Sequence, residues 1–210
     1  MIKTEQIIDC VMPAAGLSSR MGQWKLMLPY RGQTILDQSI ENALSHCSRV
    51  ILVVGYRSEE LRQRYQLDDR IVVVINADYQ QGMFSSIQCG VALVNSEHFF
   101  ICHGDMPCIS SATYQRMWRA RGQYTLFPGN EIKPGHPVLL PPSLISSILH
   151  AQPSSSMKAL IMPQPVRYLQ LNLAELYLDV DTPEAYQRLL QSYYHSHPSD
   201  RYQSDSPLLK

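Results

Sequence analysis

Residues 14–25 read Ala14-Ala15-Gly16-Leu17-Ser18-Ser19-Arg20-Met21-Gly22-Gln23-Trp24-Lys25 and directly follow an apolar run that predicts a strand. Small residues let a backbone approach a ligand closely, and consecutive amide groups in such a turn form a concave anion site. Arg20 and Lys25 add the positive charge that a triphosphate needs. The spacing excludes the Walker loop and the G-x-G-x-x-G dinucleotide turn. We interpret the segment as a phosphate-binding loop of another type; the plainer alternative is a strand-to-helix connection with two surface bases.

Short apolar runs predict the strands of a buried parallel sheet. They are too short for helices and rich in Ile and Val, and they comprise Ile7 to Met12, Val50 to Val54, Ile71 to Ile75 and Phe99 to Cys102. Segments with helical spacing separate or follow them, at residues 34–44, 82–94 and 110–122. Strands that alternate with helices imply right-handed crossovers. The expected fold class is α/β, with a three-layer, Rossmann-like, mostly parallel sheet and helices on both faces.

The later part of the chain is less regular. Val166 to Leu173 and Leu176 to Val180 are candidate strands. A last helix is predicted to begin at Thr182-Pro183-Glu184, because Thr caps, Pro fits the first helical position and Glu suits the positive end. We expect one domain over residues 1–195 and a disordered tail over residues 196–210, which are polar and repetitive.

Composition narrows the class of protein. The chain of 210 residues is 45% hydrophobic and has 18 basic and 18 acidic side chains, so no net charge attracts nucleic acid or an anionic membrane. The five cysteines form no C-x-x-C pair, which favours a reducing compartment. No apolar run approaches the length that spans a bilayer. We expect a cytoplasmic globular protein whose phosphate site is local.

A candidate metal ligand follows the fourth apolar run, where residues 103–107 read His-Gly-Asp-Met-Pro. Ligands in open α/β sheets bind at the carboxyl ends of the strands. A carboxylate there suits Mg²⁺, which commonly bridges one or two carboxylates to substrate phosphates. Asp105 is therefore the first predicted metal ligand, and an ordinary Asp-x-Pro turn is the structural alternative. Near the C-terminus, Asp179 and Asp181 flank Val180. A helix capped at Thr182 explains the presence of Glu184 well, but it explains these two aspartates less well.

Two further segments are weaker candidates. Residues 76–86, from Asn76 to Ser86, run from the end of the third strand into a helix N-terminus, from which amides and hydroxyls can reach a base or ribose. An Asn turn, a Gly hinge and Ser caps explain them equally well. Residues 135–139 read Gly-His-Pro-Val-Leu, and a lone His before Pro is also typical of a turn.

These motifs together resemble those of the MobA-like nucleotidyltransferases, and the loop resembles their molybdenum cofactor cytidylyltransferase branch. The matching patterns are A-A-G-L-S-S-R-M-G-x-x-K, N-x-x-x-x-x-G-M-x-x-S, G-D-x-P, G-H-P-V-L and D-x-D-T-P-E. The resemblance implies a fold of the nucleotide-diphospho-sugar transferase type. It also implies Mg²⁺ as cofactor, with CTP and Mo-molybdopterin as substrates.

The resemblance also assigns roles to residues. Lys25, Arg20 and Asp105 are implied to be catalytic, with Arg20 on the phosphates and Lys25 on the α-phosphate. The metal ligands are implied to be Asp105 and Asp181, with Asp179 as second choice, and Gly135 and His136 to line the acceptor pocket. The implied nucleotide-binding residues are Ala14, Ala15, Gly16, Ser18, Ser19, Gly22, Lys25, Asn76, Gly82 and Ser86.

The implied reaction transfers CMP from CTP to Mo-molybdopterin, giving molybdopterin cytosine dinucleotide and pyrophosphate. A phosphate nucleophile is already ionised at neutral pH, so no Ser-His-Asp or Cys-His set is needed. The guanylyl branch has L-A-G-G at the loop start, and the added methyl group of Ala15 favours CTP by ~1–3 kcal/mol. Pro13, where the family has an apolar residue, is a departure that affects the loop's entry.

Two alternatives stay open. One is a related Mg-dependent nucleotidyltransferase that uses another NTP or phosphorylated acceptor. The other is a noncatalytic accessory protein that hands cofactor to an apo-molybdoenzyme of the hydroxylase type, which is also the implied recipient of the product. A dinucleotide-binding oxidoreductase is disfavoured, because the second strand ends in Val-Gly-Tyr-Arg rather than an acidic residue.

Overall fold

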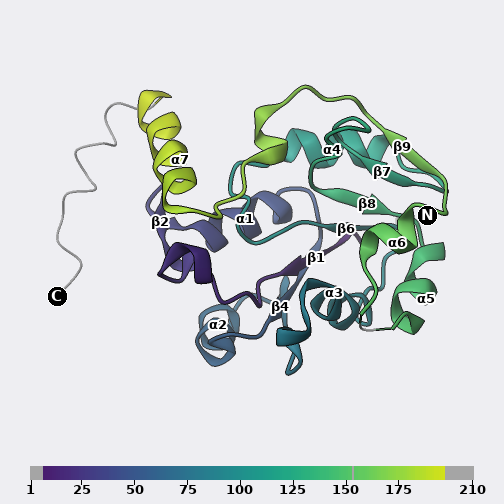
Figure 1. Ribbon diagram of the computed structural model, residues 1–210, viewed down its shortest axis with the longest axis horizontal. Coiled ribbons are helices and arrows are strands. Elements are labelled where there is room, and N and C mark those ends of the chain that lie inside the picture. The colour runs from purple at the N-terminus through teal and green to yellow at the C-terminus, as the bar shows by residue number, and fades with distance from the viewer. Residues whose placement is uncertain (1–6, 153, 197–210) are drawn as a thin grey trace, which may run out of the picture.

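Seven strands form one mostly parallel sheet in the computed structural model, which describes residues 7–152 and 154–196 (Figure 1). The strands are β1 (Asp9–Pro13), β4 (Arg49–Val54), β5 (Ile71–Ile75), β6 (Phe99–Ile101), β7 (Thr125–Phe127), β8 (Val138–Leu140) and β9 (Val166–Tyr168). Their spatial order is β5-β4-β1-β6-β8-β7-β9. Neighbours run parallel except that β8 is antiparallel to both β6 and β7. A small separate sheet pairs β2 (Pro29–Tyr30) with β3 (Gln33–Thr34).

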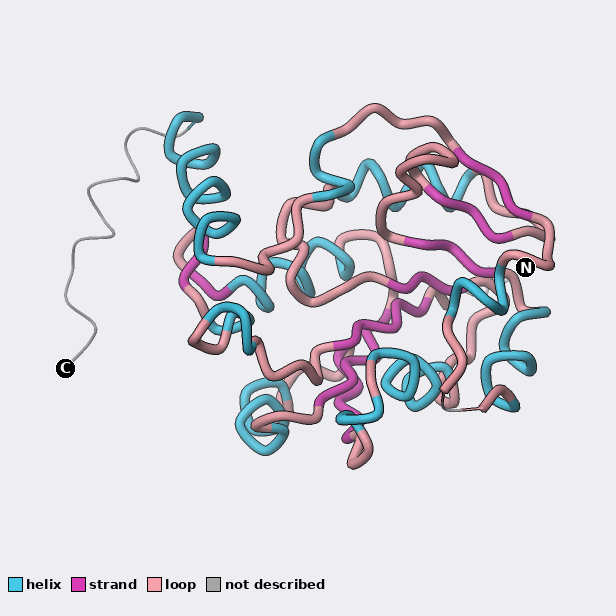
Figure 2. The backbone as a smooth tube through the Cα atoms, viewed as in Figure 1, coloured by secondary structure: helices cyan, strands magenta, loops and turns pink. Residues whose placement is uncertain are grey.

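Helices cover both faces of the large sheet, as Figure 2 shows. One face packs against α1 (Ile35–Leu44), α2 (Ser58–Tyr65) and α4 (Ser111–Arg119). The other face packs against α3 (Met83–Val91), α5 (Ser143–His150) and α6 (Met157–Ile161). Short 3₁₀ turns are η1 (Ser19–Met21), η2 (Lys25–Met27), η3 (Tyr79–Gln81) and η4 (Ala174–Tyr177). The expected three-layer α/β fold is confirmed.

The central strand β1 explains why the apolar runs are continuous rather than alternating. Successive side chains of a strand point to opposite faces of the sheet. Cys10 and Met12 lie in the core beneath α1, and Val11 lies in the core beneath α3. All three side chains are fully buried. A strand covered by helices on both faces needs apolar residues at every position.

The carboxyl end of β1 holds the segments that form the candidate site. Pro13 pairs with Val53 as the last residue of the strand, and the Ala14 amide then donates to the Val53 carbonyl at 2.8 Å. On the other side, the Gly104 amide donates to the Pro13 carbonyl at 3.4 Å. The missing N–H of Pro13 therefore does not prevent the loop from continuing along β4.

The C-terminal part differs from expectation. The candidate strand from Val166 to Leu173 is ordered as a strand only to Tyr168. The predicted strand from Leu176 to Val180 is wrong, because η4 ends at Tyr177 and the following residues form a loop. The physical reason is that the Val180 amide donates to the Asp105 carbonyl at 3.1 Å instead of to a strand. Elements β7, α2 and α6 are short and carry no clear periodic signal.

The last helix, α7 (Pro183–Ser196), begins where expected. The Ala185 amide donates to the Thr182 hydroxyl at 3.2 Å, which is an N-terminal cap. The helix packs through Leu189 against Met21 and Leu28 near the loop after β1. The predicted tail lies outside the described residues apart from Ser196, which ends α7. Within the described ranges, no helix is both long and apolar enough to cross a membrane.

Candidate nucleotide-binding site

The loop after β1 folds back on itself so that Lys25 returns to the sheet edge. Ser18 has a φ of 55° and Gly22 a φ of 66°, both in the left-handed region that reverses the chain. The Lys25 amide donates to the Ser18 hydroxyl at 3.2 Å, which closes the loop. Ser18 thus fixes the loop's shape, and Lys25 starts η2 with its ammonium directed to the carboxylates described next.

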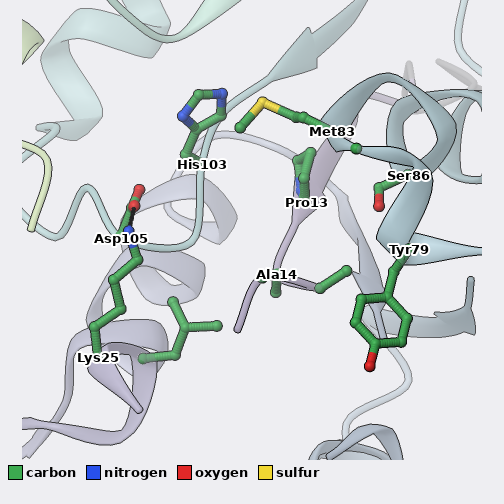
Figure 3. Close-up of a pocket in the computed structure, with 12 residues that line it drawn as sticks. Pro13, Ala14, Lys25, Tyr79, Met83, Ser86, His103 and Asp105 are labelled. Carbon is green, nitrogen blue, oxygen red and sulfur yellow. Dashed lines mark hydrogen bonds and ion pairs between the residues drawn. The ribbon is translucent and has the colours of Figure 1, made fainter. Parts of the chain in front are cut away.

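A cavity of ≈ 250 Å³, the first cavity, lies at the carboxyl ends of β1 and β6 (Figure 3). Seven of its lining residues were predicted from the sequence: Ala14, Ala15, Gly16, Lys25, Gly82, Ser86 and Asp105. The remaining lining residues are Pro13, Leu26, Tyr79, Met83 and His103. Of the predicted nucleotide-binding residues, those that do not line it are Ser18, Ser19, Gly22 and Asn76.

Lys25 joins the two predicted metal carboxylates. Its ammonium donates to Asp105 Oδ2 and, at 2.6 Å, to Asp181 Oδ1. Burial lowers the pKa of Lys25, but the charges and hydrogen bonds of the two carboxylates outweigh it, so the pKa is raised overall. Arg20, which is exposed and outside the cavity, donates to Asp181 Oδ2 at 2.7 Å. Burial raises the pKa of Asp181, but Lys25 and Arg20 hold it below its usual range.

The carboxylates fit a divalent metal. Asp105 Oδ1 is buried and has no hydrogen-bond partner among the described residues. Asp179 lies close enough that, besides burial, the charges of Asp181 and Asp105 raise its pKa. No cluster of three or more His, Cys, Asp or Glu ligands occurs in the part of the chain that the structure describes. Mg²⁺ does not require one, because waters and substrate phosphates complete its shell around one or two carboxylates.

A backbone contact brings the C-terminal acids to this site. The hydrogen bond from the Val180 amide to the Asp105 carbonyl ties residues 179–181 to the turn after β6. The Val180 side chain is fully buried in a cluster with Met21 and Leu189. Moving Val180 away from this cluster would expose apolar surface to water, which is unfavourable. Asp179 and Asp181, on either side, remain near the cavity.

Asn76 does not line the first cavity but lies behind the residues that do. Its buried amide nitrogen donates to Ser85 Oγ at 2.9 Å and to Ser86 Oγ at 3.0 Å. Its amide oxygen accepts from the Asp78 amide at 3.0 Å. These bonds hold the turn between β5 and α3, so Asn76 positions Ser86 rather than lining the cavity itself.

A larger second cavity of ≈ 760 Å³ adjoins the first, and Met83 and His103 line both. Gly135 and His136, the predicted acceptor-pocket residues, line this second cavity. The His103 and His136 rings lie 4.2 Å apart between centroids. Burial, together with the nearby His103, lowers the pKa of His136 to about 3, so its ring is neutral at pH 7.

Other lining residues of the second cavity escaped sequence reasoning. Phe127 and Tyr168 stack with centroids 5.7 Å apart, and Lys158 and Glu131 supply charge. These residues come from β7, β9, α6 and a loop, which are far apart in sequence and follow no motif. His103 was adjacent to the recognised turn, which was the one available signal.

A doubly wound sheet whose first loop directs a lysine to paired carboxylates beside a cavity suits a nucleotidyltransferase. The chain belongs to the family described as the MobA-like NTP transferase domain, which matches residues 10–168.

The chain is also similar to individual proteins. The chain is 44% identical to the molybdenum cofactor cytidylyltransferase of Escherichia coli (strain K12), over 84% of this chain and 92% of that protein. It is 27% identical to the nicotine blue oxidoreductase of Paenarthrobacter nicotinovorans, over 86% and 95%. It is also similar to the crystal structure of Rv0371c from Mycobacterium tuberculosis H37Rv in complex with manganese, with 25% identity and a TM-score of 0.71. That alignment covers 89% of this chain and 100% of the Rv0371c chain.

Proposed function

We propose that this protein transfers CMP from CTP to Mo-molybdopterin, giving molybdopterin cytosine dinucleotide and pyrophosphate. One observation carries the proposal: two cavities meet at His103, two residues before Asp105, so a nucleotide in one can face an acceptor in the other. The 44% identity to a cytidylyltransferase supports the choice of reaction.

Mg²⁺ is the proposed cofactor, and Asp105 and Asp181 are the residues that would hold it. When bound, it would neutralise charge on the triphosphate and on the departing pyrophosphate. The chain's own contribution begins with Lys25, whose raised pKa keeps it an ammonium. Placed on the α-phosphate, that charge stabilises the negative charge that develops during transfer.

On the acceptor side, the protein positions the substrate rather than supplying a catalytic base. The terminal phosphate of the acceptor is already ionised, so nothing has to remove its proton. His136, neutral at pH 7, can orient a phosphate by hydrogen bonding without acting as an acid. The stacked pair of Phe127 and Tyr168 offers aromatic surface suited to a planar pterin.

The choice of CTP rests on Ala15, which lines the first cavity. Ala15 is buried, and its methyl group occupies space that a glycine would leave to a larger base. The protein is expected to act in the cytoplasm and to pass its product to an apo-molybdoenzyme of the hydroxylase type. That recipient follows from the family resemblance.

The test incubates the purified protein with Mg²⁺, Mo-molybdopterin and each NTP in turn, and measures pyrophosphate and dinucleotide. CTP should give both products, and the other nucleotides little. A preference for GTP would contradict the argument from Ala15. Binding of nucleotide without turnover of any NTP would instead favour the noncatalytic accessory protein.

A further inference from the structure

We propose that Tyr79, held in place by Gly55, sets the width of the base end of the first cavity and is a specificity-determining residue for a single-ring base. The inference rests on the proposed use of CTP. Tyr79 occupies an unspecified position of the N-x-x-x-x-x-G-M-x-x-S pattern, to which the sequence analysis gave no role, and it lines the cavity as the first residue of η3.

The two ends of the first cavity differ in character. Lys25 and Asp105 lie at one end, and Tyr79 and Ser86 lie at the other (Figure 3). A nucleotide whose α-phosphate contacts Lys25 must extend its nucleoside away from the carboxylates, because like charges repel its phosphates. The base therefore reaches the end that Tyr79 closes.

The Tyr79 ring cannot retreat from the cavity. A β-carbon placed on Gly55 would lie 2.5 Å from Tyr79 Cγ and 2.6 Å from its Cβ, so the side chain rests directly on the Gly55 backbone. That backbone is fixed, because Gly55 follows β4 and the next amide, of Tyr56, donates to the Ala15 carbonyl at 3.3 Å. The ring therefore has a rigid support.

The turn that carries Tyr79 is also fixed. The Gln81 amide donates to the Asp78 carbonyl at 2.9 Å, and the Gly82 amide donates to the Tyr79 carbonyl at 3.2 Å. Asn76 holds this turn to α3 through Ser85 and Ser86. Ala14 and Ala15, which are buried, line the same cavity as the Tyr79 ring. With the ring and these methyl groups held in place, a second fused ring of a base would have to displace one of them.

The decisive variant changes a residue outside the cavity. Gly55 has no left-handed φ, so Gly55→Ala acts through space alone and must displace Tyr79 from its position in the cavity wall. Binding of CTP and of GTP is measured by calorimetry with Mg²⁺ and without acceptor. We expect Gly55→Ala to weaken CTP binding about tenfold or more, as misfit by one methyl group typically does. Tyr79→Ala should improve GTP binding relative to CTP by about tenfold.

The double variant Gly55→Ala, Tyr79→Ala should bind CTP within about threefold of Tyr79→Ala, because the displaced ring is gone. Gly122→Ala is the matched control: its new methyl group would crowd the Tyr124 ring in the same way, but remote from the cavity. It should leave binding unchanged.

Unchanged CTP binding in Gly55→Ala, or no recovery in the double variant, would overturn the inference. Failure of the proposed function looks different. In that case the wild type does not prefer CTP. The role of Tyr79 is then still decided by whether the double variant recovers binding of whichever nucleotide the wild type binds. Melting temperatures of all variants identify any loss of fold, and Tyr79→Ala alone then still tests the ratio of GTP to CTP binding.

Discussion

The first and second cavities meet at His103 but are built from different kinds of residue. Ionic groups dominate one end of the first: Lys25 contacts Asp105 and Asp181, and each charge has an opposite partner. The second is lined mainly by apolar and aromatic side chains, with a neutral His136. Under the proposed function, the difference means that charge is concentrated where phosphate chemistry would occur, whereas the acceptor would be selected mainly by shape. Three predictions test that division and a fourth sets a structural carboxylate apart from the site, in order from the largest expected effect to the smallest.

Removing Lys25 should have the largest effect. Lys25→Ala deletes the cation proposed to stabilise charge on the α-phosphate, so turnover should fall by about 10² to 10³. The same change frees Asp105 and Asp181 from their ammonium partner, so Mn²⁺ should bind more tightly in the absence of nucleotide. Pyrophosphate release measures the first effect, and paramagnetic titration the second. Arg62→Ala, which removes an exposed ion pair with Glu59, is the control and should change neither. Near-normal turnover of Lys25→Ala would remove it from the chemistry.

The effect of replacing each carboxylate on the Mg²⁺ requirement should follow its burial and its contacts. Asp105→Asn keeps the shape but lowers the charge of a side chain that is only 12% exposed, so the Mg²⁺ concentration for half-maximal rate should rise by about 10². Asp181→Asn should raise it less, since that side chain is 28% exposed. Asp179→Asn should raise it least. A larger effect at Asp179 than at Asp181 would exchange their roles as metal ligand.

The acceptor cavity should respond without disturbing nucleotide binding. Tyr168→Ala removes one ring of the stacked pair, which is worth about 0.5–1.5 kcal/mol beyond area burial. The KM for Mo-molybdopterin should rise roughly 3- to 10-fold, and the KM for CTP should not change. Tyr124→Ala, an aromatic residue outside both cavities, is the control. Equal changes in both KM values would contradict the division between the cavities.

The same contrast explains what the sequence could predict. The loop at residues 14–25 is contiguous, so its small residues, Arg20 and Lys25 stand together in one pattern. The layered fold follows from buried strands such as β1, which carry apolar residues throughout. The part of the second cavity that sequence reasoning missed includes residues of β7, β9 and α6, which are three to five residues long and too short for periodicity.

The wrong prediction at Leu176 to Val180 has a related cause. The segment has the residue types of a strand, but its backbone bonds to Asp105 in order to carry two acids to the site. Asn76 illustrates a subtler limit. Its position in the motif was recognised, yet only the structure places its amide on Ser85 and Ser86, behind the cavity wall. A pattern identifies residues near a site, and tertiary hydrogen bonds decide which of them can touch a ligand.

The smallest effect separates a structural carboxylate from the functional ones. Burial raises the pKa of Asp37, but bonds from Arg64, Thr34 and Tyr65 lower it further, to about 2. A folded pKa below the unfolded one, 3.8, gives stability that is present above pH 4 and lost as pH falls toward 2. That loss should be about 1–2 kcal/mol, after allowing for partial exposure. Urea unfolding at pH 5 and pH 3 measures about half of it, because pH 3 still lies above the folded pKa. Asp37→Asn should show a shallower fall while keeping its turnover at pH 7. An equal fall in both proteins would mean that other carboxylates, including Asp181, carry the acid sensitivity.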